Sequence, residues 1–295
     1  MVRYICKDIE DMVKKKYVID KSSEMCNKEL QYVFSGGGFC GFYGVGIGHI
    51  VNNYMDKTKI RGLIGSSAGA LNVVFIACGI SAVDWYETFH ILLRAVAKGK
   101  SLVEAINISN DETLPINAHE ICNKYNVEIV CSKITPFGLK RVVFSHFSSR
   151  EELLLCMKAS CCIPYVLEWK YPYCVKIGDS YYIDGGLVDN TPIKKNCKYD
   201  QVVVKVYNLS YPIRHRFGPS DTKVHRIMIQ GAEDFVSVIN DSSNINKKVF
   251  KIVKANTVAK RRQNVFLYNA SVQLVIYFIL NTFSSRQIGS TSSSN

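Results

Sequence analysis

Short, continuous apolar runs recur along the chain, and each is bounded by glycine or polar residues. Runs of this length are typical of buried strands. We expect strands at residues 31–34, 60–65, 127–134, 140–145, 181–184 and 199–209. Longer apolar stretches predict helices at residues 41–55, 68–80, 83–98 and 151–163, the last of which ends before Pro164.

One expected helix joins the first two expected strands, which predicts a parallel βαβ unit with a right-handed crossover. Both strands then end at the same edge of the sheet, where ligands bind in open α/β folds. The further alternation of strands and helices favours a three-layer α/β sandwich with a mainly parallel central sheet over a barrel or a β-sandwich. The sequence contains no internal repeat.

A tight corner of small residues, Gly65-Ser66-Ser67-Ala68-Gly69, separates the second expected strand from an apolar helix. It matches the Gly-x-Ser-x-Gly nucleophile elbow, in which small residues let strand and helix approach closely and hold the serine in a strained, exposed position. The strand-to-helix context predicts Ser67 as a nucleophile. The alternative is a small-residue cap and turn that opens a buried helix.

A glycine run follows the first expected strand, at residues 36–41 (GGGFCG). Backbone N–H groups of such a loop, at the start of a helix, form a site for a phosphate or a developing oxyanion. The run also fits the Gly-x-Gly-x-x-Gly dinucleotide fingerprint, which requires an acidic residue at the end of the second strand. That strand ends in Ile64-Gly65-Ser66 and Asp56 precedes it, which argues against nucleotide binding.

Asp184, Gly185 and Gly186 end another expected strand, where an acid and two glycines alone indicate no more than a turn. Taken in order, the glycine run, the serine corner and this Asp-Gly-Gly resemble the pattern of the patatin-like phospholipase family. Residues 159–164 (ASCCIP) resemble the family's Ala-Ser-x-x-Ile-Pro segment. The resemblance covers roughly residues 30–210, and it implies a patatin-like fold and lipid acyl hydrolase activity.

The family's roles, carried over by position, make Ser67 the nucleophile and Asp184 its only partner, a dyad without histidine. Cleavage of a lipid ester is expected to proceed through an acyl-enzyme, without metal or cofactor. The resemblance gives the oxyanion site to the N–H groups of Gly36, Gly37 and Gly38. The remaining motif glycines are Gly41, Gly65, Gly69, Gly185 and Gly186.

One position departs from the family pattern, because many members carry Lys or Arg where this chain has Cys40. Phe39 and Cys40 are closer to the apolar version of animal lipid-droplet lipases, which bears on headgroup preference more than on chemistry. Two other functions stay open. A Ser-His-Asp esterase would use His215 or His225, which follow Asp184, and a catalytically silent lipid-binding or scaffold protein would keep the fold alone.

The composition, with 47% hydrophobic and 21% charged residues in 295, predicts a globular core. Lys and Arg outnumber Asp and Glu by 37 to 25, and the net charge of +12 favours an anionic partner. Together with the family resemblance, this charge indicates that the partners are membrane or lipid-droplet lipid and an anionic membrane surface, and not nucleic acid. The odd number of cysteines, 11, without a Cys-x-x-Cys pair predicts free thiols in an intracellular protein without structural zinc.

Changes in composition divide the chain into five expected parts. These are a polar N-terminal extension (1–29), a patatin-like catalytic domain (30–210), a basic helical region (211–263), an apolar C-terminal helix or membrane segment (264–284) and a disordered tail (285–295). Seven basic residues between 247 and 262, with no acid among them, predict docking to an anionic membrane. The apolar stretch 265–283 has about the length of one bilayer span, and a buried or amphipathic helix is the alternative.

Overall fold

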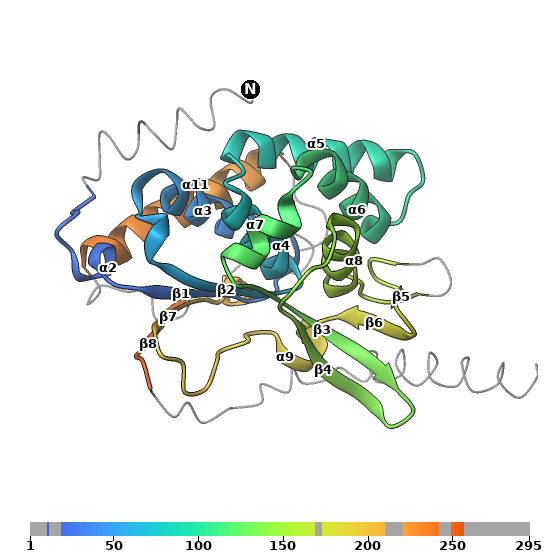
Figure 1. The fold of residues 1–295 in the computed structure, drawn as a ribbon. Helices are drawn as coiled ribbons and strands as arrows, with labels where there is room; N and C mark the ends of the chain where they lie inside the picture. Colours follow the sequence, from blue (N-terminus) through green and yellow to red (C-terminus); the bar gives the residue numbers. More distant parts are fainter. Residues whose placement is uncertain (1–10, 12–18, 169–172, 210–220, 242–248, 257–295) are drawn as a thin grey trace, which may run out of the picture.

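The protein is described by a computed structural model that covers residues 11, 19–168, 173–209, 221–241 and 249–256 (Figure 1). The described residues form one eight-stranded sheet with helices packed on it. Its strands are β1 (Leu30–Phe34), β2 (Ile60–Ser66), β3 (Val127–Thr135), β4 (Gly138–Phe144), β5 (Val175–Ile177), β6 (Ser180–Asp184), β7 (Asp200–Val204) and β8 (Phe250–Val253).

The strands lie in the order β5-β6-β3-β2-β1-β7-β8, and β4 pairs with β3 outside this path. The four neighbouring strands β7, β1, β2 and β3 are parallel. Strands β4, β5, β6 and β8 join them in antiparallel pairs. The predicted βαβ unit is therefore present, and the sheet is parallel at its centre and antiparallel at both ends.

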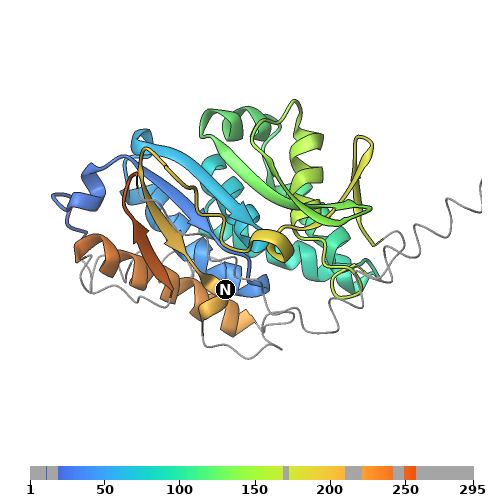
Figure 2. The same ribbon diagram turned by 90° about the horizontal axis from the view of Figure 1, so that it is seen from below.

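Helices cover mainly one face of the sheet (Figures 1 and 2). They are α2 (Glu24–Asn27), α3 (Phe42–Tyr54), α4 (Ala68–Cys78), α5 (Ala82–Ala97), α6 (Leu102–Thr113), α7 (Ala118–Lys124), α8 (Arg150–Ser160) and α11 (Asp221–Asn240). The short helix α9 (Gly186–Asp189) lies on the other side, against β3 and β4. The predicted three-layer α/β fold with a mainly parallel sheet is confirmed, and the second helical layer is short among the described residues. Three 3₁₀ turns, η1 (Gly38–Gly41), η2 (Lys57–Lys59) and η3 (Val206–Asn208), complete the elements.

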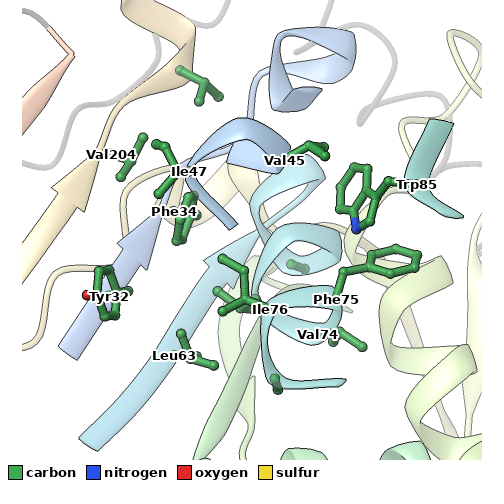
Figure 3. Packing of buried hydrophobic residues seen from close by; sticks show 14 of the residues in the cluster. Tyr32, Phe34, Val45, Ile47, Leu63, Val74, Phe75, Ile76, Trp85 and Val204 are labelled. Carbon is green, nitrogen blue, oxygen red and sulfur yellow. The ribbon is translucent and has the colours of Figure 1, made fainter. Parts of the chain in front are cut away.

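Alternation along the strands divides the buried side chains between the two faces of the sheet. Tyr32 and Phe34 of β1 face the helices, where they belong to the main hydrophobic core (Figure 3). Val33, between them, faces the other way and joins a small cluster with Ile64 and Val130. The core thus fixes the sheet against α3 and α4, the two helices that follow the glycine run and the serine corner.

The sequence missed several elements outside the central unit. Helices α6 and α7 and strand β5 were not expected, and α8 ends at Ser160, before the predicted stop at Pro164. The expected helical region 211–263 contains helix α11, but the helical prediction is wrong for Phe250–Val253, which form strand β8 beside β7. The boundaries of the expected domains stay predictions.

The C-terminal segments 264–284 and 285–295 lie outside the described residues, as does most of the N-terminal extension 1–29. Among the residues that are described, no helix combines the length and hydropathy needed to cross a bilayer.

Candidate active site

The register of β3 brings two predicted site segments together. Val130 of β3 pairs with Ser66, at the end of β2, and the next residue, Cys131, pairs with Asp184, at the end of β6. Strand β2 runs parallel to β3 and β6 runs antiparallel to it, so β2 and β6 approach this point from opposite directions. Their C-terminal ends meet there, although Ser67 and Asp184 are 117 positions apart in the sequence.

Ser67 occupies the sharp turn between β2 and α4 with φ 54° and ψ −129°. A non-glycine residue at positive φ carries strain of about 1–3 kcal/mol, which is characteristic of a nucleophile elbow. The flanking glycines permit the turn, because a Cβ at Gly65 would lie 2.2 Å from the Gly69 oxygen and one at Gly69 would lie 2.3 Å from the Phe34 oxygen. The predicted strand–turn–helix context of the serine corner is therefore present.

Ser67 and Asp184 contact each other directly. Ser67 Oγ donates to Asp184 Oδ2 at 2.6 Å, and the Gly186 N–H donates to Asp184 Oδ1 at 2.7 Å. Asp184 is only 3% exposed. Burial raises the pKa of Asp184 to about 7, although the hydrogen bonds from Ser67 and Gly186 act in the opposite direction. A carboxyl group with this pKa can exchange a proton near neutral pH, which an ordinary aspartate does poorly.

The glycine run lies beside Ser67, since a Cβ placed on Gly36 would lie 2.9 Å from Ser67 Cβ. The Gly36 N–H donates to the backbone oxygen of Asn190 at 3.2 Å, which conflicts with the expected role of this N–H as an oxyanion donor. The N–H groups of Gly37 and Gly38 have no acceptor among the described residues. Gly38 has φ 58°, a conformation that favours glycine, and it opens the turn η1. Two of the three expected donors are thus available to a ligand.

Two residues that support this geometry were not assigned a role from the sequence. Ser160, the last residue of α8, accepts the Ser67 N–H at 2.8 Å and donates to the Val130 oxygen at 2.7 Å. Asn190 links the glycine run to the loop after Asp184. Its backbone oxygen accepts the hydrogen bond from the Gly36 N–H, and its side chain lies beside Gly186. Ser160 lies in the ASCCIP segment, so the sequence located it without indicating its function.

The close approach of the other motif glycines explains their residue type. A Cβ at Gly41 would lie 2.8 Å from Ala68 Cβ, and one at Gly185 would lie 2.0 Å from the Val130 oxygen. A Cβ at Gly186 would lie 2.9 Å from Asp184 Oδ1. A side chain at any of these positions would displace the elements that meet at Ser67.

An apolar pocket opens at Ser67, with about 700 Å³ of empty space including its open mouth. Its walls come from η1 and from one face each of α4, α5 and α6. The apolar lining residues are Phe39, Phe42, Ala68, Leu71, Phe75, Trp85, Phe89, Leu92, Leu102, Ile106, Cys161 and Leu167. The pocket has the chemistry of an alkyl-chain site, and no sequence motif marked it, because α5 and α6 carry only ordinary amphipathic patterns.

The two candidate histidines have different positions relative to this site. His225 lies on α11, a helix that packs on α3, and His215 lies outside the described residues. Because Ser67 Oγ reaches Asp184 directly, no imidazole stands between these two groups. In the described part of the chain, no three His, Cys, Asp or Glu side chains gather as a group that could hold a metal ion.

A family model and several curated proteins match part of this chain. The family model for patatin-like phospholipase matches residues 91–195, which include Asp184 and leave Ser67 outside. The 1-acylglycerol-3-phosphate O-acyltransferase PNPLA3 of Homo sapiens is 29% identical over 176 residues, 54% of this chain. The patatin-like phospholipase domain-containing protein 2 of Mus musculus is 28% identical over 174 residues, and the human omega-hydroxyceramide transacylase is 26% identical over 174 residues.

These matches span only about a third of the curated relatives, 34%, 34% and 31% of their lengths. Among solved structures, the ExoU-SpcU complex of Pseudomonas aeruginosa covers 88% of this chain and 60% of its own at 12% identity. Its TM-score of 0.36 supports no further conclusion. The family-model match contains the ASCCIP segment and Asp184-Gly185-Gly186, and it leaves out the glycine run and the serine corner. The resemblance to the patatin-like phospholipase family that the sequence predicts is therefore confirmed by the family model over residues 91–195, and the curated relatives include a protein named for the same domain.

Proposed function

We propose that the protein is a lipid acyl hydrolase that cleaves carboxylic esters through a Ser67–Asp184 dyad. The observation that carries this proposal is the 2.6 Å hydrogen bond from Ser67 Oγ to a buried carboxyl group whose pKa is raised to about 7. The strained turn at Ser67 and the apolar pocket that opens beside it support the same function. The names of the relatives, which include acyltransferases and a transacylase, describe chemistry on acyl lipids.

In the first half of the reaction, Ser67 Oγ attacks the ester carbonyl carbon while its proton moves to Asp184 Oδ2. The Gly37 and Gly38 N–H groups stabilise the negative oxygen of the tetrahedral intermediate. The carbon–oxygen bond to the leaving alcohol then breaks, and Asp184 returns the proton to that alcohol. The acyl chain, now esterified to Ser67, occupies the apolar pocket.

In the second half, a water molecule attacks the acyl-enzyme carbonyl and gives a proton to Asp184. Collapse of the intermediate releases the fatty acid, and Ser67 regains its proton from Asp184. An alcohol of a second lipid in place of water would transfer the acyl group instead, which is the chemistry that the relatives' names describe. Both outcomes use the same acyl-enzyme and the same two residues.

We extend the proposal to the surface on which the enzyme works. Long-chain esters are held in membranes or lipid droplets, and the net charge of +12 favours an anionic surface. The basic residues between 247 and 262 are the expected docking segment, and all but Lys251 and Lys254 of this group lie outside the described residues. Charge neutralisation of the segment is expected to weaken vesicle binding at low salt, as measured by flotation.

The test of the dyad is ester hydrolysis by the full chain and by two variants. Ser67→Ala is expected to abolish turnover and Asp184→Asn to lower it by about 10²–10⁴-fold, the scale of a lost catalytic base. His215→Gln and His225→Gln serve as matched variants for the triad alternative. Unchanged turnover in Ser67→Ala would refute the proposal, and a loss that follows a histidine would replace the dyad by a triad. A folded protein that hydrolyses no ester would favour the silent lipid-binding alternative.

A further inference from the structure

The pocket beside Ser67 is not uniformly apolar. Thr88 of α5 and Ser109 and Asn110 of α6 also line it. Two of these side chains donate to helix carbonyls, Thr88 Oγ1 to the Asp84 oxygen at 2.7 Å and Ser109 Oγ to the Ile106 oxygen at 2.9 Å. Asn110 is 2% exposed, and its Nδ2 has no hydrogen-bond partner in the described part of the chain. Asn110, a residue of the pocket wall, therefore carries a buried amide donor that no described residue satisfies.

Asn110 lies at the end of the pocket away from Ser67. The Phe75 and Trp85 rings, 4.5 Å apart between centroids, hold the start of α5 beside the end of α4 (Figure 3). The contact of Thr88 Oγ1 with Thr113 Oγ1 at 2.7 Å holds the start of α5 beside the end of α6, the end that carries Asn110. Ser67 precedes α4, so the pocket follows the helix from its first turn to Phe75.

The length of this path can be expressed in bonds of an acyl chain. Ser67 and Phe75 are eight positions apart, which corresponds to roughly 12 Å along a helix axis. An extended chain advances about 1.2 Å per bond, as an extended backbone does over its three bonds per residue. A chain attached at Ser67 therefore reaches the Asn110 end of the pocket after roughly ten bonds.

A saturated hydrocarbon chain would leave the Asn110 amide buried without a partner, which is unfavourable for any polar group. An oxygen atom on the chain at that depth would accept its N–H. We propose that Asn110 selects acyl chains that carry an oxygen acceptor, such as a hydroxyl group, near the middle of the chain. This inference rests on the function proposed above. The step involved is hydrogen bonding alone, and the bond-breaking chemistry at Ser67 is unchanged.

The test measures binding first, so that it does not depend on turnover. The full-length Ser67→Ala protein is loaded with a fluorescent fatty acid, which is displaced by 10-hydroxystearate, 2-hydroxystearate or stearate. The 10-hydroxy acid is expected to bind about 2- to 10-fold more tightly than stearate, the range for one net hydrogen bond. The 2-hydroxy acid has the same polarity as the 10-hydroxy acid, but its hydroxyl group would lie near residue 67. It is therefore expected to bind no more tightly than stearate.

Asn110→Leu, in the Ser67→Ala protein, is expected to abolish the preference for the 10-hydroxy acid. Asn72→Leu is the matched control, because Asn72 is also fully buried with an amide that has no partner among the described residues, and it does not line the pocket. A second readout is the ratio of turnover on the 10-hydroxystearoyl and stearoyl esters by the protein with Ser67 intact. This ratio is expected to fall to about one in Asn110→Leu and to persist in Asn72→Leu.

Equal binding of 10-hydroxystearate and stearate would overturn the inference, as would a preference that survives Asn110→Leu with the fold retained. Equal binding would mean that water, and not the ligand, accepts the hydrogen bond of the Asn110 amide. Selective binding without any hydrolysis by the protein with Ser67 intact would refute the proposed function and leave the assignment of the pocket in place. The two failures are therefore distinguishable.

Discussion

Replacement of Asp184 by Asn is expected to stabilise the protein while it removes activity. Asp184 is 3% exposed, and its pKa is about 7 in the folded protein. In the unfolded chain an aspartate has a pKa of about 3.9. Between these values the unfolded chain releases the proton and the folded protein keeps it, so the free energy of unfolding falls as the pH rises. Above pH 7 the ionised carboxylate is buried at full cost.

The magnitude follows from the difference between the two pKa values. A gap of about three units at about 1.4 kcal/mol each gives about 4 kcal/mol. Asparagine has nearly the same shape, keeps an oxygen for the Gly186 N–H and carries no charge to bury. Asp184→Asn is therefore expected to differ little from the parent at pH 4 and to be more stable by about 4 kcal/mol at pH 8. At roughly 2 °C per kcal/mol, its Tm at pH 8 rises by about 8 °C.

Thermal unfolding of parent and variant between pH 4 and 8 tests this expectation. Asp200→Asn is a matched control of opposite sign. Burial raises the pKa of Asp200, but hydrogen bonds from the Ala255 N–H and Lys254 outweigh it and hold that pKa below its usual value. Asp200→Asn is thus expected to lose stability above pH 4. A difference between parent and Asp184→Asn that does not grow with pH would refute the raised pKa on which the dyad depends.

Three further outcomes are expected. The kcat/KM for ester hydrolysis is expected to rise with pH and to level off above about pH 7, because only ionised Asp184 can take the Ser67 proton; a profile that falls through this range would exclude it as the base. Ser160→Ala leaves the Ser67 N–H without its acceptor and is expected to cost about 1–3 kcal/mol in unfolding free energy together with a drop in kcat; normal kcat would show that Ser160 does not position the turn. Gly65→Ala places a Cβ 2.2 Å from the Gly69 oxygen and is expected to destabilise the fold by several kcal/mol in thermal unfolding, and a fully stable variant would contradict the close approach of β2 and α4.

The sequence predicted the central unit well because local patterns determine it. The apolar run of β2, the small residues around Ser67 and the apolar helix α4 are contiguous, and each signal agrees with its neighbours. The expected meeting of Asp184 with Ser67 rested on family resemblance, since the register of β3 that joins β2 and β6 is a long-range feature. No local sequence pattern indicates which residues of β3 pair with β2 and which pair with β6.

The parts that the sequence missed depend on tertiary contacts. Strand β8 carries the pattern Phe-Lys-Ile-Val, in which the single lysine suits an edge strand, and its pairing with β7 distinguishes it from a helix. The pocket is formed by facing sides of α4, α5 and α6, so Asn110 could not be placed near Ser67 from spacing alone. The Gly36 N–H, expected at the oxyanion site, has its acceptor in Asn190, 154 positions later.

The central claim is that Ser67 is a nucleophile activated by Asp184, and covalent labelling tests it without knowledge of the natural lipid. The full-length protein is treated with a fluorophosphonate, and the modified residue is located by mass spectrometry. We expect one adduct on Ser67, no adduct in Ser67→Ala, and much slower labelling in Asp184→Asn. A folded protein that stays unlabelled at Ser67, or that is labelled equally fast without the Asp184 carboxylate, would contradict the account.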